Sequence, residues 1–243
     1  MRVYRTFTHE ALAPERLVRL SEEEGRHLAS VRRVAIGDAV MITNGRGQAY
    51  RGAVESLGKG TTSVRVLEAH RETADCGPRR ELAIGLTRSE AFDDMLHGAV
   101  ELGMTHFQPL LTERTVVELD EKRVQKRLER WGRICTEALK QSERLWMPVI
   151  EPPREVGEYL KHIAGQPGRT MLLAERVPGE PVARLRDAAG EDLRFMVGPE
   201  GGWTPKEREE ILAAGATAFS FGEGFILRSE TAALAVLALG QAG

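Results

Sequence analysis

Short segments in which apolar and polar residues alternate make up most of the first seventy residues. An alternation with period two predicts strands, here over residues 1–7, 39–43, 48–55 and 61–68. Asn44-Gly45 lies between the second and third of these segments and predicts a hairpin, because both residues tolerate the positive φ of a tight turn. Ser21 followed by Glu24 predicts a capping box that opens a helix from Glu22 to about Arg32. A small β-barrel with one helix accommodates these elements, since closing a sheet removes its exposed edges.

After a polar segment at residues 72–80, strand patterns alternate with helix patterns. Strands are predicted over residues 81–87, 106–111, 170–174, 193–197 and 217–221. Helices are predicted over residues 89–102, 121–144, 205–214 and 229–239, the first capped by Ser89 and ended by Gly103. This alternation predicts an α/β fold with a mostly parallel sheet. The sequence therefore predicts two domains, a barrel over residues 1–75 and an α/β domain over residues 76–243.

A glycine-rich loop, Val197-Gly-Pro-Glu-Gly-Gly-Trp203, follows one predicted strand directly. Thr204, Pro205 and Glu207 predict a capping box at the start of the next helix, with proline at its first position. Glycines let backbone N–H groups approach a ligand closely, and the helix N-terminus adds a positive dipole. The loop matches neither the dinucleotide fingerprint nor the Walker pattern. A tight turn selected only for its geometry is the alternative interpretation.

A second loop, residues 221–232, also joins a strand to a helix. Arg228 and Glu230 flank Ser229, the predicted cap of the last helix. By themselves, these residues favour a structural explanation, with Arg228 solvated and the Glu230 carboxylate complementing the helix dipole. Ligands of parallel sheets gather at the carboxyl ends of the strands. Two such loops at one sheet edge therefore favour a binding site.

The overall charge does not indicate a nucleic-acid partner, but its distribution is uneven. The 34 basic and 36 acidic side chains give −2, whereas residues 1–80 carry 14 basic and 10 acidic side chains, or +4. Arginine binds phosphate bidentately, so this bias is explained either by an RNA partner or by genome composition. Cys76 and Cys135 are far apart, which argues against a disulfide framework and for a reducing cytoplasm. The six histidines show no metal-ligand spacing, and no apolar run is long enough to span a bilayer.

Several motifs, in order along nearly the whole chain, carry a resemblance to a known family. VGPEGGWTPKE at residues 197–207 and FILRSETAAL at 225–234 resemble the paired C-terminal motifs of the ribosomal small-subunit methyltransferase E family of the SPOUT class. Residues 27–38, 101–103, 113–115 and 133–144 are similar to further segments of that family. Two departures stand out: Phe225 occupies a position where the family usually has arginine, and the lysines usual between Arg88 and Glu101 are absent.

The resemblance implies a PUA-like β-barrel followed by a SPOUT-type α/β domain tied in a trefoil knot, acting as a homodimer. It implies S-adenosylmethionine as cofactor and 16S rRNA, within the small ribosomal subunit, as substrate, methylated at N3 of a uridine, with neither a metal nor a membrane involved. The implied cofactor-binding residues are Leu173, Glu175, Gly198, Glu200, Gly201, Gly202, Gly222, Ile226, Leu227 and Thr231. The implied RNA-binding residues are Arg32, Arg33, Arg88, Arg114 and Arg144.

The chemistry of N3 methylation suggests roles for two residues of the last motif. The uridine N3–H must lose its proton, so a base or a stabilising cation is required. We expect Arg228 to supply the cation and Glu230 to orient it or to take the proton. A ribose 2′-O methyltransferase of the same fold and a non-catalytic RNA-binding assembly factor remain the alternatives. The helix over residues 232–239 is apolar nearly all round, which favours a dimer interface or burial within one chain.

Overall fold

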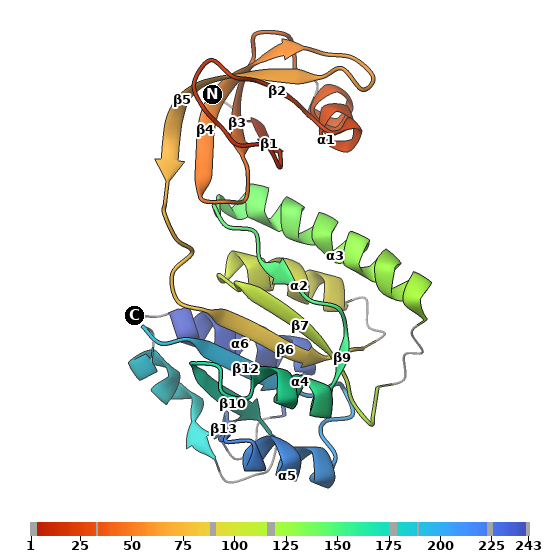
Figure 1. The fold of residues 1–243 in the computed structure, drawn as a ribbon, viewed down its shortest axis with the longest axis vertical. Coiled ribbons are helices and arrows are strands. Elements are labelled where there is room, and N and C mark those ends of the chain that lie inside the picture. The colour runs from red at the N-terminus through yellow and green to blue at the C-terminus, as the bar shows by residue number, and fades with distance from the viewer. Residues whose placement is uncertain are drawn as a thin grey trace. The chain divides into compact units, whose positions relative to one another are not determined.

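The chain packs as two units, and the sequence of the second unit is interrupted by a segment of the first (Figure 1). The computed structural model describes residues 4–32, 34–87, 91–115, 120–174, 179–188, 190–222 and 226–241. Unit 1 comprises residues 1–76 and 136–147, and unit 2 comprises residues 77–135 and 148–243. This division differs from a single boundary at residues 75–76, because residues 136–147 pack on the N-terminal strands.

Unit 1 is a mixed five-stranded sheet in the order β1-β3-β4-β5-β2. Its strands are β1 (Tyr4–Phe7), β2 (Leu17–Arg19), β3 (Ala39–Thr43), β4 (Gln48–Ser56) and β5 (Ser63–Glu72). The predicted hairpin is confirmed as β3 and β4, whereas the three-residue β2 was too short to be predicted. Among the described residues the pairing ends at β1 and β2 without joining them, so hydrogen bonding does not close the predicted barrel.

The helical segment of unit 1 begins at Ser21 as predicted, but its capping box is only half formed. Helix α1 (Glu22–Arg26) continues as the π-helical turn η1 (His27–Arg32), and the Ser21 hydroxyl accepts the Glu24 N–H at 3.2 Å. The Glu24 carboxylate does not return to Ser21. It accepts hydrogen bonds from the Thr6 hydroxyl at 2.7 Å and from the Phe7 N–H at 2.9 Å. The prediction of a reciprocal box was wrong because Glu24 is buried against β1.

Unit 2 contains an eight-stranded sheet in which every observed pairing is parallel, which confirms the predicted α/β class. The order is β11-β13-β10-β12-β6-β7-β8, and β9 also pairs with β7. The strands are β6 (Arg80–Gly85), β7 (His106–Leu111), β8 (Val149–Ile150), β9 (Arg154–Glu155), β10 (Arg169–Leu173), β11 (Glu180–Pro181), β12 (Leu193–Val197) and β13 (Thr217–Ser220). The two-residue strands β8, β9 and β11 were not predicted.

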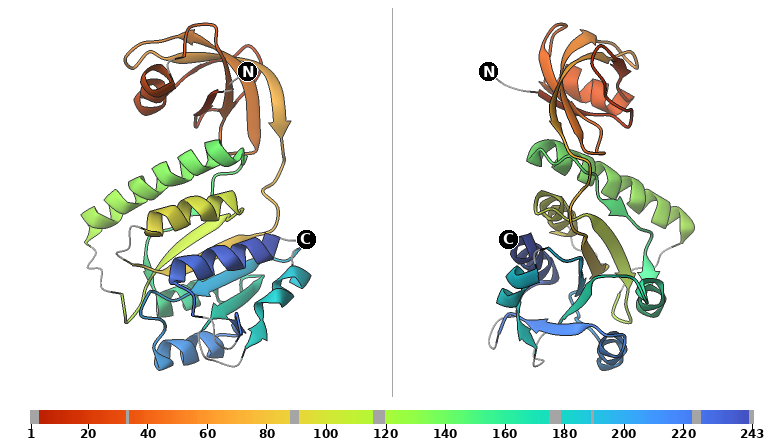
Figure 2. Two further views of the ribbon diagram at one scale, coloured as in Figure 1. Left: turned by 180° about the vertical axis from the view of Figure 1, so that it is seen from behind. Right: turned by 60° about the vertical axis from the view of Figure 1, so that its left-hand side comes forward.

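Helices cover both faces of this sheet (Figure 2). They are α2 (Ala91–Glu101), α3 (Glu121–Ser142), α4 (Val156–Ile163), the 3₁₀ helix η2 (Val182–Ala188), α5 (Pro205–Ala213) and α6 (Ser229–Gln241). Helix α6 contacts α2, η2, β6 and β12, whereas α4 and α5 contact each other and the opposite face. Gly103, with φ +83°, follows the end of α2 as predicted. The sequence analysis did not predict α4. No helix of the described segments is long and apolar enough to cross a membrane.

Candidate functional site

A cavity of about 650 Å³ lies at the carboxyl ends of β10, β12 and β13. Its volume is in the range of cavities that hold cofactors and other small molecules. Its position agrees with the rule that parallel sheets bind ligands beyond their strand ends. The lining residues are Arg114, Leu173, Ala174, residues 197–203, Arg208, residues 219–222, residues 226–230 and Ala232.

The two predicted loops meet in this cavity and are joined by a hydrogen bond. Gly202 has φ +68°, and its N–H donates to the Pro199 carbonyl at 2.8 Å, which closes a tight turn. A Cβ on Gly198 would lie 3.2 Å from the Gly202 carbonyl carbon, so the turn leaves little room for a side chain there. The Ser229 hydroxyl donates to the Gly198 carbonyl. Ser229 is the first residue of α6, and its hydroxyl bonds to the glycine-rich loop. This corrects its predicted role as the cap of the helix.

A third loop, residues 112–115, supports the glycine-rich turn. The Arg114 guanidinium donates to the Gly201 carbonyl. The buried Glu207 carboxylate accepts the Glu113 N–H at 2.8 Å and the Thr204 N–H at 2.9 Å. The latter completes the predicted capping box of α5. Arg114, expected to contact RNA, therefore forms part of the cavity wall.

Two further residues shape the cavity, and sequence reasoning assigned neither of them a site role. The buried Trp203 donates its indole N–H to the Leu173 carbonyl at 3.1 Å and so ties the glycine-rich loop to the end of β10. Gly85 ends β6, and a Cβ there would lie 2.5 Å from Pro199 Cδ. A glycine inside an apolar strand often marks such a close backbone approach, which was the available signal for Gly85.

Arg228 and Glu230 both line the cavity but do not contact each other. Arg228 is exposed, whereas Glu230 is 8% exposed. No hydrogen bond or ion pair joins these two residues, both of which belong to the described part of the chain. Glu230 Oε1 is buried and has no hydrogen-bond partner among the residues that the structure describes. Because leaving a buried acceptor unsatisfied costs free energy, this oxygen marks a position for a ligand's donor.

Most of the other predicted cofactor residues gather here. Leu173, Gly198, Glu200, Gly201, Gly202, Gly222, Ile226 and Leu227 line the cavity. Thr231 is exposed and is not among the lining residues, since its position in the first turn of α6 directs it outward. Glu175, Phe225, Arg88 and Arg33 lie outside the described residues, and the side chain of Arg32 is likewise not described.

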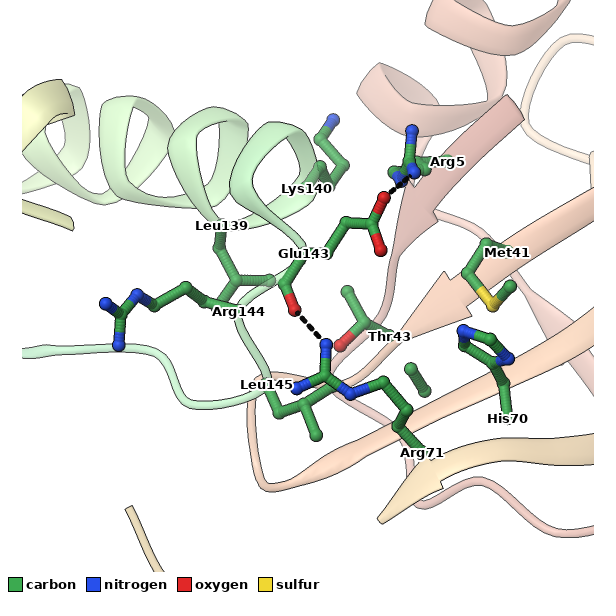
Figure 3. Close-up of a pocket in the computed structure, with 11 residues that line it drawn as sticks. Arg5, Met41, Thr43, His70, Arg71, Leu139, Lys140, Glu143, Arg144 and Leu145 are labelled. Atoms are coloured by element: carbon green, nitrogen blue, oxygen red, sulfur yellow. Dashed lines mark hydrogen bonds and ion pairs between the residues drawn. The ribbon is translucent and has the colours of Figure 1, made fainter. Parts of the chain in front are cut away.

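Arg144 belongs to unit 1, where it lines a small pocket with room for about one water molecule (Figure 3). Arg5 and Arg71 converge there on Glu143: Arg5 forms an ion pair with its carboxylate, and Arg71 donates to its carbonyl at 3.3 Å. Burial lowers the pKa of Arg144. Two of the predicted RNA-binding residues therefore belong to different units, Arg114 to unit 2 and Arg144 to unit 1.

In the segments that the structure describes, no group of three or more His, Cys, Asp or Glu side chains is placed to hold a metal ion. The cavity instead offers backbone groups, one buried carboxylate and the exposed guanidinium of Arg228.

Two family models of RNA methyltransferases match the chain, one in the strand-rich N-terminal part and one over the parallel sheet with its loop-lined cavity. Residues 77–241 match the family model of the RNA methyltransferase domain, and residues 20–67 match that of the RNA methyltransferase PUA domain. The chain is 34% identical over 233 residues to the ribosomal RNA small subunit methyltransferase E of Synechocystis, covering 93% of this chain and 75% of that protein. The chain belongs to the ribosomal RNA small subunit methyltransferase E family.

Solved structures agree with this assignment. The family member of Neisseria gonorrhoeae, crystallised with S-adenosylmethionine, superposes with a TM-score of 0.84 at 31% identity, covering 98% of this chain and 96% of that one. A methyltransferase of Legionella pneumophila, solved with the same cofactor, gives a TM-score of 0.90 at 25% identity, covering 100% and 98% of the two chains.

Proposed function

We propose that this protein transfers a methyl group from S-adenosylmethionine to N3 of a uridine in the 16S rRNA of the small ribosomal subunit. The observation that carries the proposal is the cavity formed by three loops at one edge of the parallel sheet, in a chain of this family. Relatives with bound S-adenosylmethionine support the choice of cofactor.

The residues of the cavity fit such a cofactor. Its volume of about 650 Å³ suits a nucleoside-sized ligand. Gly198, Gly201 and Gly202 present backbone without side chains. Leu173, Ile226 and Leu227 provide apolar walls. S-adenosylmethionine supplies an electrophilic methyl group when bound.

The catalytic proposal assigns separate tasks to Arg228 and Glu230, in keeping with the absence of a contact between them. The N3–H proton of the target uridine passes to the Glu230 carboxylate, whose Oε1 has no other partner. The exposed Arg228 guanidinium stabilises the negative charge that develops on the uracil ring. Removal of the proton leaves a lone pair on N3, and this lone pair is the nucleophile.

The proposed division of labour follows the two expected domains. Residues 1–75 form the PUA-like RNA-binding domain, in which Arg32 and Arg33 contact phosphates. Residues 76–243 form the catalytic domain, in which Arg88 contacts phosphates. Phosphate contacts of this kind position RNA without reading its sequence. A trefoil knot around the cavity loops completes the proposed SPOUT fold. The protein is proposed to act in the cytoplasm.

A homodimer formed through α6 is also part of the proposal. The buried Val236 and Leu237 are covered by the chain's own α2 and sheet, whereas Leu234, Ala238 and Leu239 keep exposed surface. This remaining apolar surface is available to pack against the same helix of a second chain, which supports the proposed homodimer. Light scattering at micromolar concentration tests it, and a mass near the 26.9 kDa of one chain would contradict it.

Mass spectrometry of 16S rRNA from cells with and without the protein tests the function. The expected result is one uridine that carries a methyl group on its base in rRNA from cells with the protein and lacks this methyl group in rRNA from cells without it. The purified protein with labelled S-adenosylmethionine and small subunits should reproduce it. A methyl on the ribose would instead identify a 2′-O methyltransferase, and absence of cofactor binding would indicate a non-catalytic factor.

A further inference from the structure

Helix α3 carries a concentration of positive charge that the cavity does not use. Residues 121–133 contain six basic side chains and two acidic ones, a net charge of +4. The remainder of unit 2 contains 14 basic and 22 acidic side chains, a net charge of −8. The segment of α3 over residues 121–133 is therefore net positive, whereas the rest of this unit is net negative.

Three of the basic residues form a straight row on the exposed side of α3. Lys122, Lys126 and Arg133 are all exposed, and at 100° per residue they fall within an arc of about 40°. Over eleven residues, the row extends for about 17 Å. Trp131 and Cys135, on the opposite side of the helix, are buried. Arg130, paired with Asp93, extends the row, and Glu129 is the one acidic residue within it.

The row is not explained by the stability of the helix. Within the described segments, the side chains of Lys122, Lys126 and Arg133 have neither an ion-pair nor a hydrogen-bond partner. Like charges four residues apart, such as Lys122 and Lys126, destabilise a helix. A cation in the first turn also opposes the helix dipole. An unpaired row with these costs points to a ligand.

The shape of the row indicates the chemistry of that ligand. Cations spaced over about 17 Å match an extended polyanion better than a single small anion. None of the exposed large apolar side chains lies on α3, whereas protein interfaces have an apolar centre. Arg114 of the cavity wall and Lys122 are eight residues apart, so at most about 28 Å of chain separates them. One RNA molecule can span this distance.

We propose that Lys122, Lys126 and Arg133 form a second contact surface for the phosphate backbone of the RNA substrate, within the catalytic unit itself. This proposal rests on the methyltransferase function proposed above. It adds three phosphate contacts to those proposed for Arg32, Arg33 and Arg88.

The test is the triple substitution K122Q/K126Q/R133Q, measured for binding to 16S rRNA transcribed in vitro. Glutamine retains helix propensity. Loss of three phosphate contacts should lower the affinity about 100-fold at 0.1 M salt and reduce the slope of log affinity against log salt by about 2. Each single substitution should lower the affinity about fivefold. The affinity for S-adenosylmethionine should not change.

A matched control removes three charges elsewhere on the same unit. Lys161, Arg169 and Arg184, the residues changed in K161Q/R169Q/R184Q, are exposed, are not part of α3 and do not line the cavity, so this variant should bind the RNA nearly as the wild type does. Equal losses in both triple variants would reveal a general charge effect and overturn the proposal. Unchanged affinity for bare rRNA in the α3 variant, with weaker binding only to assembled subunits, would also overturn it and assign the row to a ribosomal protein. A wild type that binds neither S-adenosylmethionine nor rRNA would instead refute the proposed function.

Discussion

The close approach of β6 to the glycine-rich loop makes Gly85→Ala a sensitive probe of the cavity. The added Cβ would lie 2.5 Å from Pro199 Cδ and 2.6 Å from Pro199 N, whereas ordinary contacts begin at 3.4 Å. The loop must therefore move by about 0.9 Å to accept one methyl group. Overpacking of this kind costs about 1–3 kcal/mol of stability. A displacement near 1 Å at a site can cost about 100-fold in function.

Calorimetry with S-adenosylmethionine and thermal unfolding measure the two effects separately. We expect Gly85→Ala to bind the cofactor up to ~100-fold more weakly while remaining folded. Gly157→Ala is the matched control, because Gly157 is exposed on α4 and a Cβ there meets nothing within 4 Å. Wild-type cofactor affinity in Gly85→Ala would refute the view that the position of the Pro199 turn defines the site.

Three further predictions address catalysis, stability and reactivity. Arg228→Ala should lower the single-turnover methylation rate by on the order of 100-fold at saturating cofactor, with little change in cofactor affinity, and a near-wild-type rate would exclude Arg228 from the chemistry. Lys140→Met should lower the free energy of unfolding by about 3–5 kcal/mol, because it leaves the buried Glu24 carboxylate, 2.6 Å from the ammonium, without its cation. Burial opposes the charge of Lys140, but Glu24 and a neighbouring glutamate outweigh burial and raise its pKa above the ordinary 10.5. The stabilisation should therefore be complete below about pH 10.5 and lost as the pH rises through the folded-state pKa, which urea unfolding at several pH values checks. In thiol labelling of the native protein, the exposed Cys76 should react, whereas Cys135 should not react until unfolding, because burial raises its pKa to about 12.

Local sequence signals predicted those elements whose causes are local. The β3–β4 hairpin and β12 follow from turn chemistry and an apolar run, and the start of α5 follows from Thr204 and Glu207. Strands β8, β9 and β11 are two residues long, and their pairing with distant strands leaves no periodic pattern in the sequence. The motifs also indicated which loops belong together, since both follow strands of one parallel sheet.

The partners of individual polar side chains depended on the tertiary structure. Glu24 and Ser229 each had a plausible local role at a helix start, yet distant atoms compete for the same groups: β1 and Lys140 bind Glu24, and the Gly198 carbonyl binds Ser229. The family resemblance implied an RNA contact for Arg114, and the tertiary structure adds a hydrogen bond from its guanidinium to the Gly201 carbonyl, which no local pattern indicated.

By itself the sequence determined the α/β class, the two cavity loops and the family, because periodicity, capping and ordered motifs are properties of neighbouring residues. Only the tertiary structure decided that residues 136–147 pack with the N-terminal strands, that Gly85 contacts the Pro199 turn, and that Arg228 and Glu230 line one cavity without contacting each other. These outcomes depend on contacts between residues far apart in the chain. Whether such a contact forms depends on which other groups in the folded chain compete for the same side chain. The order of residues along the chain does not show which of these groups will be near.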